Sequence, residues 1–179
     1  MFSLAPIVAS LLLVSAALAT PMARAACNPS LSGSGLSIAN GNLEIGYTSS
    51  VAGAPLISQT FSLAPEFIGE ASTIDNGGFV LKDVNQDNHA PGLFPTFVDG
   101  GALELETLAT PEDGKQGWGF VCSTCSDFTT AATPIASGCT IRSGWTGQCL
   151  QIGSAAGDLV TLATCTGLGS GPQYFDIYV

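Results

Sequence analysis

Few side chains in this sequence are suited to catalysis. Glu104 and Glu106 stand two residues apart in the segment LELE, so they share one face of a predicted strand. Two carboxylates can act as acid and base in glycoside hydrolysis. Alternation with leucines, however, is the ordinary pattern of a strand with one solvated face. The only histidine, His89, lies in a polar stretch without a nucleophile motif. We therefore predict that the protein is not an enzyme.

A run of oxygen-bearing side chains follows the apolar segment at 79–81. Asp83, Asn85 and Asp87 match the first three ligand positions of an EF-hand-like calcium loop. The pattern then fails, because Asn88 stands where the loop needs glycine and Phe94 where it needs glutamate. Turn residues between two strands explain the run equally well. The sequence predicts no cofactor, and calcium binding is the weaker interpretation.

Six cysteines are present, and two of them form the pattern Cys122-Ser-Thr-Cys125. Redox chemistry at such a motif needs a thiolate at a helix N-terminus, which a chain of strands and turns does not supply. A four-cysteine zinc site is the other alternative. We interpret the cysteines as structural. Cys27, Cys122, Cys125 and Cys139 allow three pairings that the sequence does not separate.

Trp145 lies in the segment RSGWTGQ, between two glycines. A turn of this composition holds an aromatic ring outward, where its face can stack on a ligand. The alternative is a ring folded back onto the hairpin that follows. Trp145 is therefore a candidate ligand-binding residue.

Export and charge limit the partners of the chain. Residues 1–19 read as a signal peptide with a small-residue cleavage site at Ala17-Leu18-Ala19, and cleavage as late as residue 25 also fits. No later segment is long and apolar enough to span a membrane. The formal charge of −10 leaves no basic patch for nucleic acid or an anionic membrane surface. We predict a secreted, acidic protein with residues 26–179 as a single disulfide-stabilised domain.

Short alternating apolar segments separated by Gly, Asn and Asp turns predict an all-β domain. Gln-x-aromatic triplets recur at intervals of 57 residues: Gln59 to Phe61, Gln116 to Trp118 and Gln173 to Phe175. A hairpin signal precedes each triplet, at Asn40-Gly41, Asp99-Gly100 and Gly157-Asp158. Three units of about 50 residues are typical of a β-trefoil. A β-sandwich with coincidental spacing is the alternative.

The segment from Gly147 to Ile177 contains Cys149-Leu150, a second cysteine at Cys165 and the closing Gln173-Tyr174-Phe175. This order resembles one unit of the ricin B-type lectins, whose units end on Gln-x-Trp. The resemblance implies a Cys149–Cys165 disulfide and carbohydrate binding. It also implies that Phe61, Trp118 and Phe175 belong to a shared core rather than to a binding site.

The resemblance does not extend to the sugar-binding residues of the family. In the third unit, the positions of its Asp, Gln, aromatic and Asn are occupied by Gln151, Thr161, Ala163 and Pro172. The second unit keeps Asp99 near the first of these positions. The first unit offers Glu44 and, one place from the aromatic slot, Tyr47. The candidate ligand-binding residues are therefore Glu44, Tyr47, Asp99 and Trp145.

We conclude from the sequence that this is a non-catalytic secreted binding module. Carbohydrate is the ligand that the resemblance implies. The alternative is an extracellular interaction protein or protease inhibitor that uses the loops Val51–Pro55 and Pro91–Pro95, since loops vary without disturbing a core.

Overall fold

The computed structural model describes residues 26–73, 78–85, 92–98, 101–109, 113–126, 133–167 and 171–179. In these ranges the regular secondary structure is all β. No helix in the described part of the chain has the length and apolar character needed to cross a membrane. The strands are β1 (Gly35–Asn40), β2 (Leu43–Tyr47), β3 (Leu56–Thr60), β4 (Phe67–Ala71), β5 (Phe79–Asp83), β6 (Leu93–Phe97), β7 (Leu103–Thr107), β8 (Trp118–Val121), β9 (Thr124–Cys125), β10 (Ala136–Ser143), β11 (Cys149–Gln151), β12 (Thr161–Ala163) and β13 (Phe175–Tyr178).

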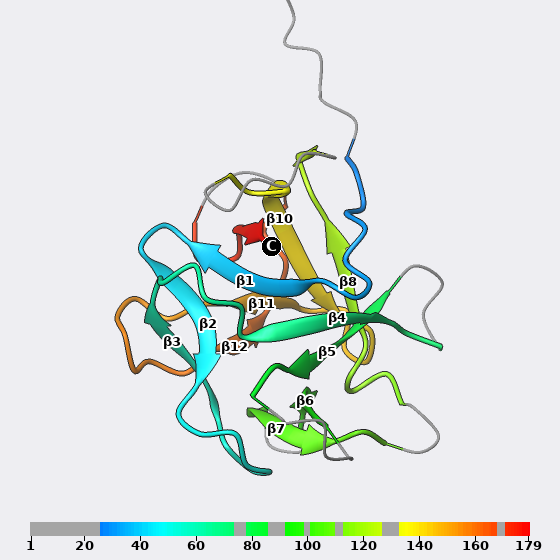
Figure 1. Ribbon diagram of the computed structural model, residues 1–179, viewed down its shortest axis with the longest axis vertical. Coiled ribbons are helices and arrows are strands. Elements are labelled where there is room, and N and C mark those ends of the chain that lie inside the picture. Colours follow the sequence, from blue (N-terminus) through cyan, green and yellow to red (C-terminus); the bar gives the residue numbers. More distant parts are fainter. Residues whose placement is uncertain are drawn as a thin grey trace, which may run out of the picture.

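Six of these strands form a closed barrel. β1 pairs with β4, β4 with β5, β5 with β8, β8 with β10, and β10 with β13. β13 then pairs with β1 and completes the ring, with every pair antiparallel. Figure 1 shows β1 and β10 next to the red C-terminal strand, with β8 beside β10 and β4 below β1. Closure leaves the barrel without a free sheet edge.

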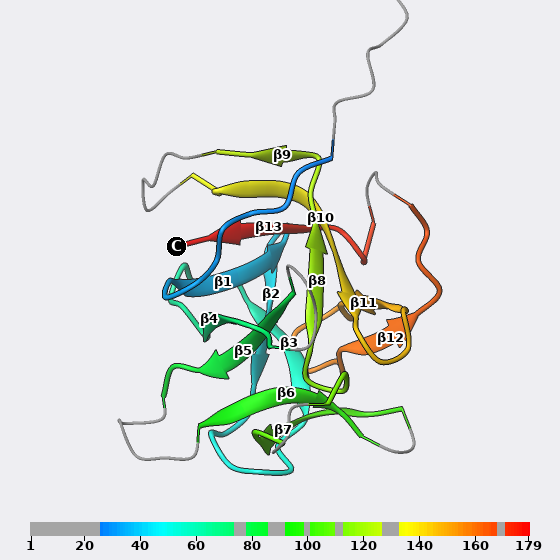
Figure 2. The same ribbon diagram turned by 90° about the vertical axis from the view of Figure 1, so that its right-hand side faces the viewer.

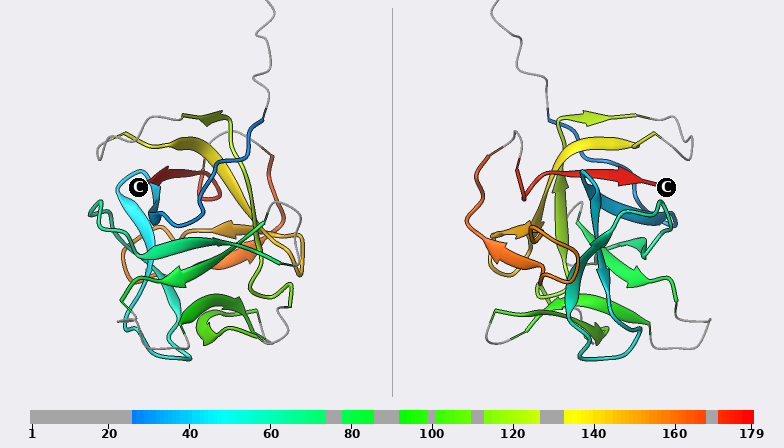
Figure 3. Two further views of the ribbon diagram at one scale, coloured as in Figure 1. Left: turned by 45° about the vertical axis from the view of Figure 1, so that its right-hand side comes forward. Right: turned by 90° about the vertical axis from the view of Figure 1, so that its left-hand side faces the viewer.

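Three hairpins lie outside this ring: β2–β3, β6–β7 and β11–β12. They meet one another, because Pro55 bridges to Glu104 and Ile57 bridges to Leu159. Figure 2 shows β6 and β7 at the end of the molecule opposite β9, which pairs with β10. The β11–β12 hairpin, gold and orange, lies at one side of the molecule in the right-hand view of Figure 3.

A single apolar core fills the space between barrel and hairpins. The strands β4, β8 and β13 begin with Phe67, Trp118 and Phe175, which are all buried. Aliphatic side chains from the other strands complete the cluster, among them Leu36, Ile45, Leu103, Leu105 and Ile141. Burial of this apolar surface is the main stabilising contribution.

Two buried glutamines fix the chain just before β8 and β13. The Gln116 amide donates to the Thr107 carbonyl oxygen at 2.9 Å and accepts from the Ala109 N–H at 2.8 Å. Gln173 makes the same two bonds, to the Thr164 carbonyl at 3.0 Å and from the Thr166 N–H at 3.0 Å. The repeated pattern therefore has a physical basis: the amide ties the end of a hairpin to the start of a barrel strand, where it satisfies backbone groups.

The first Gln-x-aromatic triplet, unlike the other two, does not lie at the start of a barrel strand. Gln59 lies within β3, and Phe61 is half-buried outside the core cluster, with its ring 4.9 Å from that of Tyr178. Phe67 holds the place at the start of β4 that the sequence analysis gave to Phe61. The reason is a shift by one strand: the Asn40-Gly41 turn joins β1 to β2, whereas the hairpin outside the barrel is β2–β3.

One predicted loop is also replaced by a strand. Leu93–Phe97 forms β6, and Pro95 is buried within it, where its carbonyl oxygen accepts from Trp118 Nε1 at 3.2 Å. The segment Pro91–Pro95 is therefore not a surface loop, and Pro91 itself lies outside the described residues. The other predicted loop, Val51–Pro55, does connect β2 to β3.

All six cysteines are paired. Cys149 is bonded to Cys165, the pair that the lectin resemblance implied. Of the three open pairings, the structure has Cys27–Cys125 and Cys122–Cys139. The two cysteines of the Cys122-Ser-Thr-Cys125 motif are therefore not bonded to each other, and each belongs to a different disulfide. Cys122 and Cys139 are completely buried, which suits a structural disulfide.

Candidate functional site

Glu44 is a buried structural residue. Its side chain has no exposed surface and lies between β1 and β3. One carboxylate oxygen accepts from Ser37 Oγ, and the other accepts from Ser62 Oγ at 2.9 Å and Gln59 Nε2 at 3.3 Å. Since protein donors take both oxygens, Glu44 is not a contact for a ligand from solvent, and this prediction is corrected.

Tyr47 is held in a similar way. Its ring packs edge-on against Phe67, with centroids 5.9 Å apart. Its hydroxyl donates to Asp83 Oδ1 and accepts from Asn85 Nδ2 at 2.6 Å. Burial, together with the Asp83 contact, raises the pKa of the Tyr47 hydroxyl. A ring fixed against the core does not offer a stacking face, so the first-unit candidates Glu44 and Tyr47 do not form a site.

Asp83, the first residue of the calcium-like run, is also a buried residue whose carboxylate is bound by donors of the protein itself. It is completely buried, and its two oxygens accept from Tyr47, from Ser50 Oγ and from the Asn85 N–H at 2.8 Å. Asp87, Asn88 and His89 lie outside the described residues. In the described part of the chain, no three His, Cys, Asp or Glu side chains gather in a way that suits a metal ion.

A third carboxylate, Glu66, joins this network. Gln59 Nε2 donates to Glu66 Oε1 at 2.6 Å and also to Glu44, so one amide bridges two acids. A Cβ on Gly46 would lie 2.3 Å from Gln59 Cδ, which explains the glycine beneath this amide. Burial raises the pKa of the Glu66 carboxyl, and repulsion from Glu44 adds to the effect.

Stability should therefore change with pH through Glu66. A carboxyl whose pKa is raised on folding stabilises the fold while it is protonated, and the contribution is lost as the pH rises through the folded-state pKa. The contribution is thus fully present below the ordinary pKa of 4.5 and decreases above it. We expect Glu66→Gln, which keeps an acceptor for Gln59, to lose less stability than the wild type between about pH 4 and pH 7. Chemical unfolding of both proteins across this range measures the difference, and parallel curves would contradict it.

Trp145 is the predicted candidate that the structure does place at the surface. Its side chain is 57% exposed in the loop between β10 and β11. Ser143 Oγ accepts from the N–H groups of Trp145 and Thr146 at 3.2 and 3.3 Å, so the turn is fixed. Lys115 Nζ lies 5.6 Å from the centre of the ring, a cation–π contact. Trp145 therefore offers an exposed ring face for stacking.

The remaining predicted acids are Asp99, Glu104 and Glu106. Asp99 lies outside the described residues. Glu104 and Glu106 are both half-buried on β7, with Leu103 and Leu105 buried on the opposite face. This is the arrangement expected of a strand with one face toward the core.

A polar hollow of about 410 Å³ lies beside the β11–β12 hairpin. Its size falls within the range of small-molecule sites. Gln151 and Thr161 face each other across the two strands, and Leu159 is 59% exposed on the rim. The remaining lining residues are Ile152, Gly153, Ser154, Asp158 and Pro172.

The turn that forms one wall of this hollow is firmly held. Asp158 Oδ2 accepts from the N–H groups of Ser154 and Ala155, both at 2.9 Å, and from Ser154 Oγ at 3.1 Å. The backbone donors, Ala155 first, lower the pKa of the Asp158 carboxyl, so it is ionised at neutral pH. Among the described residues, none donates to its second oxygen, Oδ1. A Cβ on Gly153 would lie 2.2 Å from Asp158 Cβ, which explains why a glycine stands there.

The same turn is anchored on the first hairpin. Buried Ser58 accepts from the Gly153 N–H with its Oγ at 2.8 Å and donates its own N–H to the Asp158 carbonyl at 2.8 Å. On the other wall, the Ile152 N–H donates to the Pro172 carbonyl at 2.9 Å. Hydrogen bonds within the protein therefore hold the backbone on both sides of the hollow.

The sequence analysis missed this site. Its lining includes three of the four residues that replace the sugar-binding residues of the lectin family, namely Gln151, Thr161 and Pro172, but not Ala163. Comparison with the lectin family showed only that its sugar-binding residues are absent from the third unit. No local signal in the sequence marks the hollow, because its turn is anchored on Ser58, which is distant in the sequence.

Solved structures of three proteins resemble this one. A designed threefold-symmetric protein, ThreeFoil, matches 82% of this chain and 99% of its own, at 13% identity and a TM-score of 0.54. Cytolethal distending toxin from Actinobacillus actinomycetemcomitans matches 81% of this chain and 90% of its own, at 14% identity and a TM-score of 0.55. The lysenin pore matches 80% of this chain and 44% of its own, at 14% identity and a TM-score of 0.53. The fold is trefoil-like.

Sequence comparison adds nothing to this result, because no family model and no curated protein matches the chain. At 13–14% identity the structural likeness shows the fold alone. The function of this trefoil-like chain therefore has to be argued from its own residues.

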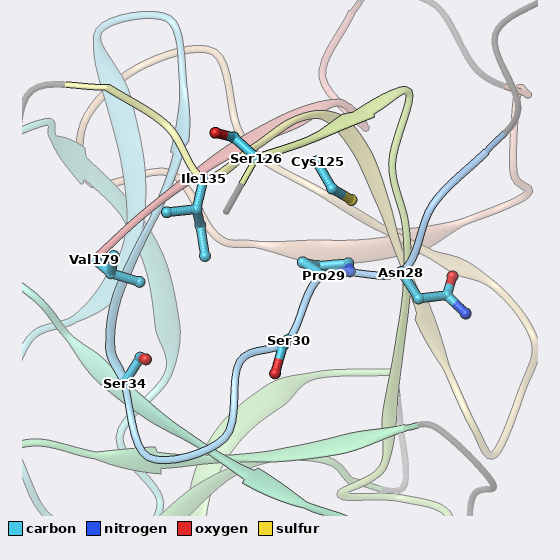
Figure 4. A pocket seen from close by; sticks show the side chains of 8 residues that line it. All are labelled: Asn28, Pro29, Ser30, Ser34, Cys125, Ser126, Ile135 and Val179. Atoms are coloured by element: carbon cyan, nitrogen blue, oxygen red, sulfur yellow. The ribbon is translucent and has the colours of Figure 1, made fainter. Parts of the chain in front are cut away.

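A further hollow of the trefoil-like domain lies beside the N-terminal segment, with a volume of about 330 Å³. Figure 4 shows Ile135 and Val179 at one end of it and Asn28 and Cys125 at the other. Pro29, Ser30, Ser34 and Ser126 complete the lining. No ionisable side chain is present among these residues, and the hollow lacks the charged acceptor found at Asp158. It is the weaker candidate for a polar ligand.

Proposed function

We propose that this chain is a non-catalytic carbohydrate-binding module and that the sugar binds in the hollow beside the β11–β12 hairpin. One observation carries the proposal. A recess with converging polar groups lies at the positions where the lectin resemblance places a sugar site, although the residues there differ from those of the family.

The lining matches the chemistry of a sugar. The Gln151 amide offers both donors and an acceptor, the Thr161 hydroxyl offers one of each, and Asp158 Oδ1 is an acceptor. The apolar side of a sugar ring needs a matching surface, and exposed Leu159 supplies it in place of an aromatic ring. Since an aliphatic side chain gives a smaller contact than an aromatic face, we expect modest affinity.

The lectin-like interpretation includes a division of the chain into three equivalent units, which is part of the proposal. We place them at β1–β4, β5–β8 and β10–β13, each with two barrel strands and one hairpin. Gln116 and Gln173 make matching backbone contacts 57 residues apart. The first unit lacks this glutamine and has Pro65 two residues before Phe67. The chain would thus be a divergent relative of the ricin B-type lectins.

Secretion and the lack of catalysis belong to the same proposal. Three disulfides in one domain are typical of oxidising compartments. Glu44 and Asp83 are occupied by protein donors, which leaves them without a role as acid or base. A secreted module that only binds glycans needs neither a catalytic acid nor a catalytic base.

A glycan array probed with the oxidised, folded protein tests the proposed function. We expect binding to neutral glycans, because the hollow contains Asp158 and the chain carries a formal charge of −10. Absence of binding to every glycan at high protein concentration would remove the proposal.

The alternative function, an extracellular interaction protein or protease inhibitor, has one observation in its favour. Val51 is 56% exposed on the β2–β3 loop, which is fixed by the bond from the Gly53 N–H to the Leu105 carbonyl at 2.8 Å. A rigid loop with an exposed apolar tip suits insertion into a partner's pocket. Inhibition assays against a protease panel test this function, and uniformly negative results would exclude inhibition.

A further inference from the structure

A second, apolar hollow adjoins the polar one. It has a volume of about 330 Å³ and lies where the three hairpins meet. Its apolar lining comes from the residue before β3, the start of β7 with the residue before it, and the segment before β12, namely Pro55, Ala102, Leu103, Leu159 and Val160. Leu159 and Thr161 line both hollows, so the two lie next to each other with the exposed Leu159 side chain between them.

The position of Leu159 is fixed by the fold. Its backbone bridges to Ile57, and the neighbouring Val160 N–H donates to the Leu56 carbonyl at 3.0 Å. A single exposed leucine is ordinary on a protein surface. Here it stands on a rigid backbone between an apolar and a polar recess, and both recesses therefore present surface to one ligand.

Charge limits what this ligand can be. Asp158 lines the polar hollow and Glu104 lines the apolar one, while neither lining contains a lysine or arginine among the described residues. Both hollows therefore disfavour an anionic group such as a phosphate or a fatty-acid carboxylate. A neutral molecule with one hydroxylated end and one apolar end matches the two recesses.

We propose that the preferred ligand is a neutral glycoside with an apolar aglycone, whose sugar lies in the polar hollow and whose aglycone lies in the groove between Ala102 and Leu159. This inference rests on the proposed carbohydrate function. It specifies the class of ligand more narrowly than the proposed function does. The group attached to the sugar contributes to binding, so a free sugar or a methyl glycoside binds more weakly than a glycoside with an apolar aglycone.

Matched glycosides test the proposal. Methyl and phenyl β-D-glycosides of galactose, glucose and N-acetylglucosamine are titrated into the intact, oxidised protein by calorimetry. For the sugar that binds, the phenyl glycoside should bind about tenfold more tightly, because its ring is removed from water in the groove. Ala102→Gln fills the groove with a neutral side chain, so it should reduce this advantage to about twofold or less and leave methyl glycoside affinity unchanged.

The outcomes separate the two levels of the proposal. Binding of neither glycoside, for any of the three sugars, overturns the inference, and a glycan array that is also negative overturns the carbohydrate function with it. Equal affinity for methyl and phenyl glycosides overturns the inference alone, as does an advantage that Ala102→Gln leaves intact. Benzyl alcohol bound as tightly as the phenyl glycoside would show that the groove acts without the sugar, which also contradicts the proposal. Leu159→Asn provides a second variant, and it should weaken both glycosides because Leu159 lines both hollows.

Discussion

Phe67→Ala should lower the free energy of unfolding by about 3–5 kcal/mol, which is the usual cost of deleting a buried phenylalanine. Phe67 is completely buried at the start of β4 and packs against Tyr47. Phe61→Ala should cost only about 1 kcal/mol, because the ring is half-buried outside the core and loses a single aromatic contact. Equilibrium unfolding in denaturant, with disulfides intact, measures both values.

This pair of variants tests which aromatic residue, Phe61 or Phe67, contributes its ring to the core in the first part of the barrel. The two side chains are identical and lie six residues apart, so each is the natural control for the other. A larger cost for Phe61→Ala than for Phe67→Ala would restore the assignment made from the sequence and contradict the structure.

Gln151→Ala combined with Thr161→Ala should weaken glycan binding about fivefold or more, since two neutral hydrogen bonds contribute about 0.5–1.5 kcal/mol each. Both side chains line the hollow, and Thr161 is exposed. Gln173 loses the 3.3 Å bond to Gln151 but keeps its bond to the Thr164 carbonyl, so the fold should be retained. Calorimetric titration with the strongest glycan measures the change, and thermal unfolding checks the fold.

Two further variants make this test specific. Thr48→Ala removes an exposed threonine that does not line the hollow, and it should leave binding unchanged. Trp145→Ala removes the other surface candidate. If Trp145→Ala abolished binding while the Gln151 and Thr161 changes did not, the site would lie on the β10–β11 loop and our assignment would be wrong.

Local patterns made much of the fold predictable. Alternating apolar residues marked β7 and the first strands, and the Gln-x-aromatic triplets at Gln116 and Gln173 marked the entry to two barrel strands. The first unit could not be aligned in the same way. Its strongest turn signal, Asn40-Gly41, joins a barrel strand to a hairpin strand, and the chance placement of Gln59 preserved the 57-residue interval.

The candidate site was harder to predict, because burial depends on contacts distant in sequence. Glu44 appeared to be an exposed acid on an alternating strand, yet Ser37, Gln59 and Ser62 from other segments surround it. The hollow, in contrast, forms only where the turn at 153–158 is anchored on Ser58, nearly one hundred residues earlier. Neither the burial of Glu44 nor the anchoring of the turn on Ser58 can be recognised from the residues next to them in the sequence.

An NMR titration of the isotopically labelled protein with the strongest array glycan tests the central claim most directly. The account predicts saturable shifts of the backbone amides of Gln151, Ser154 and Thr161, which surround the hollow, while those of Glu44 and Tyr47 stay in place. Saturable shifts confined to other residues, or no saturable shift with any glycan, would contradict it.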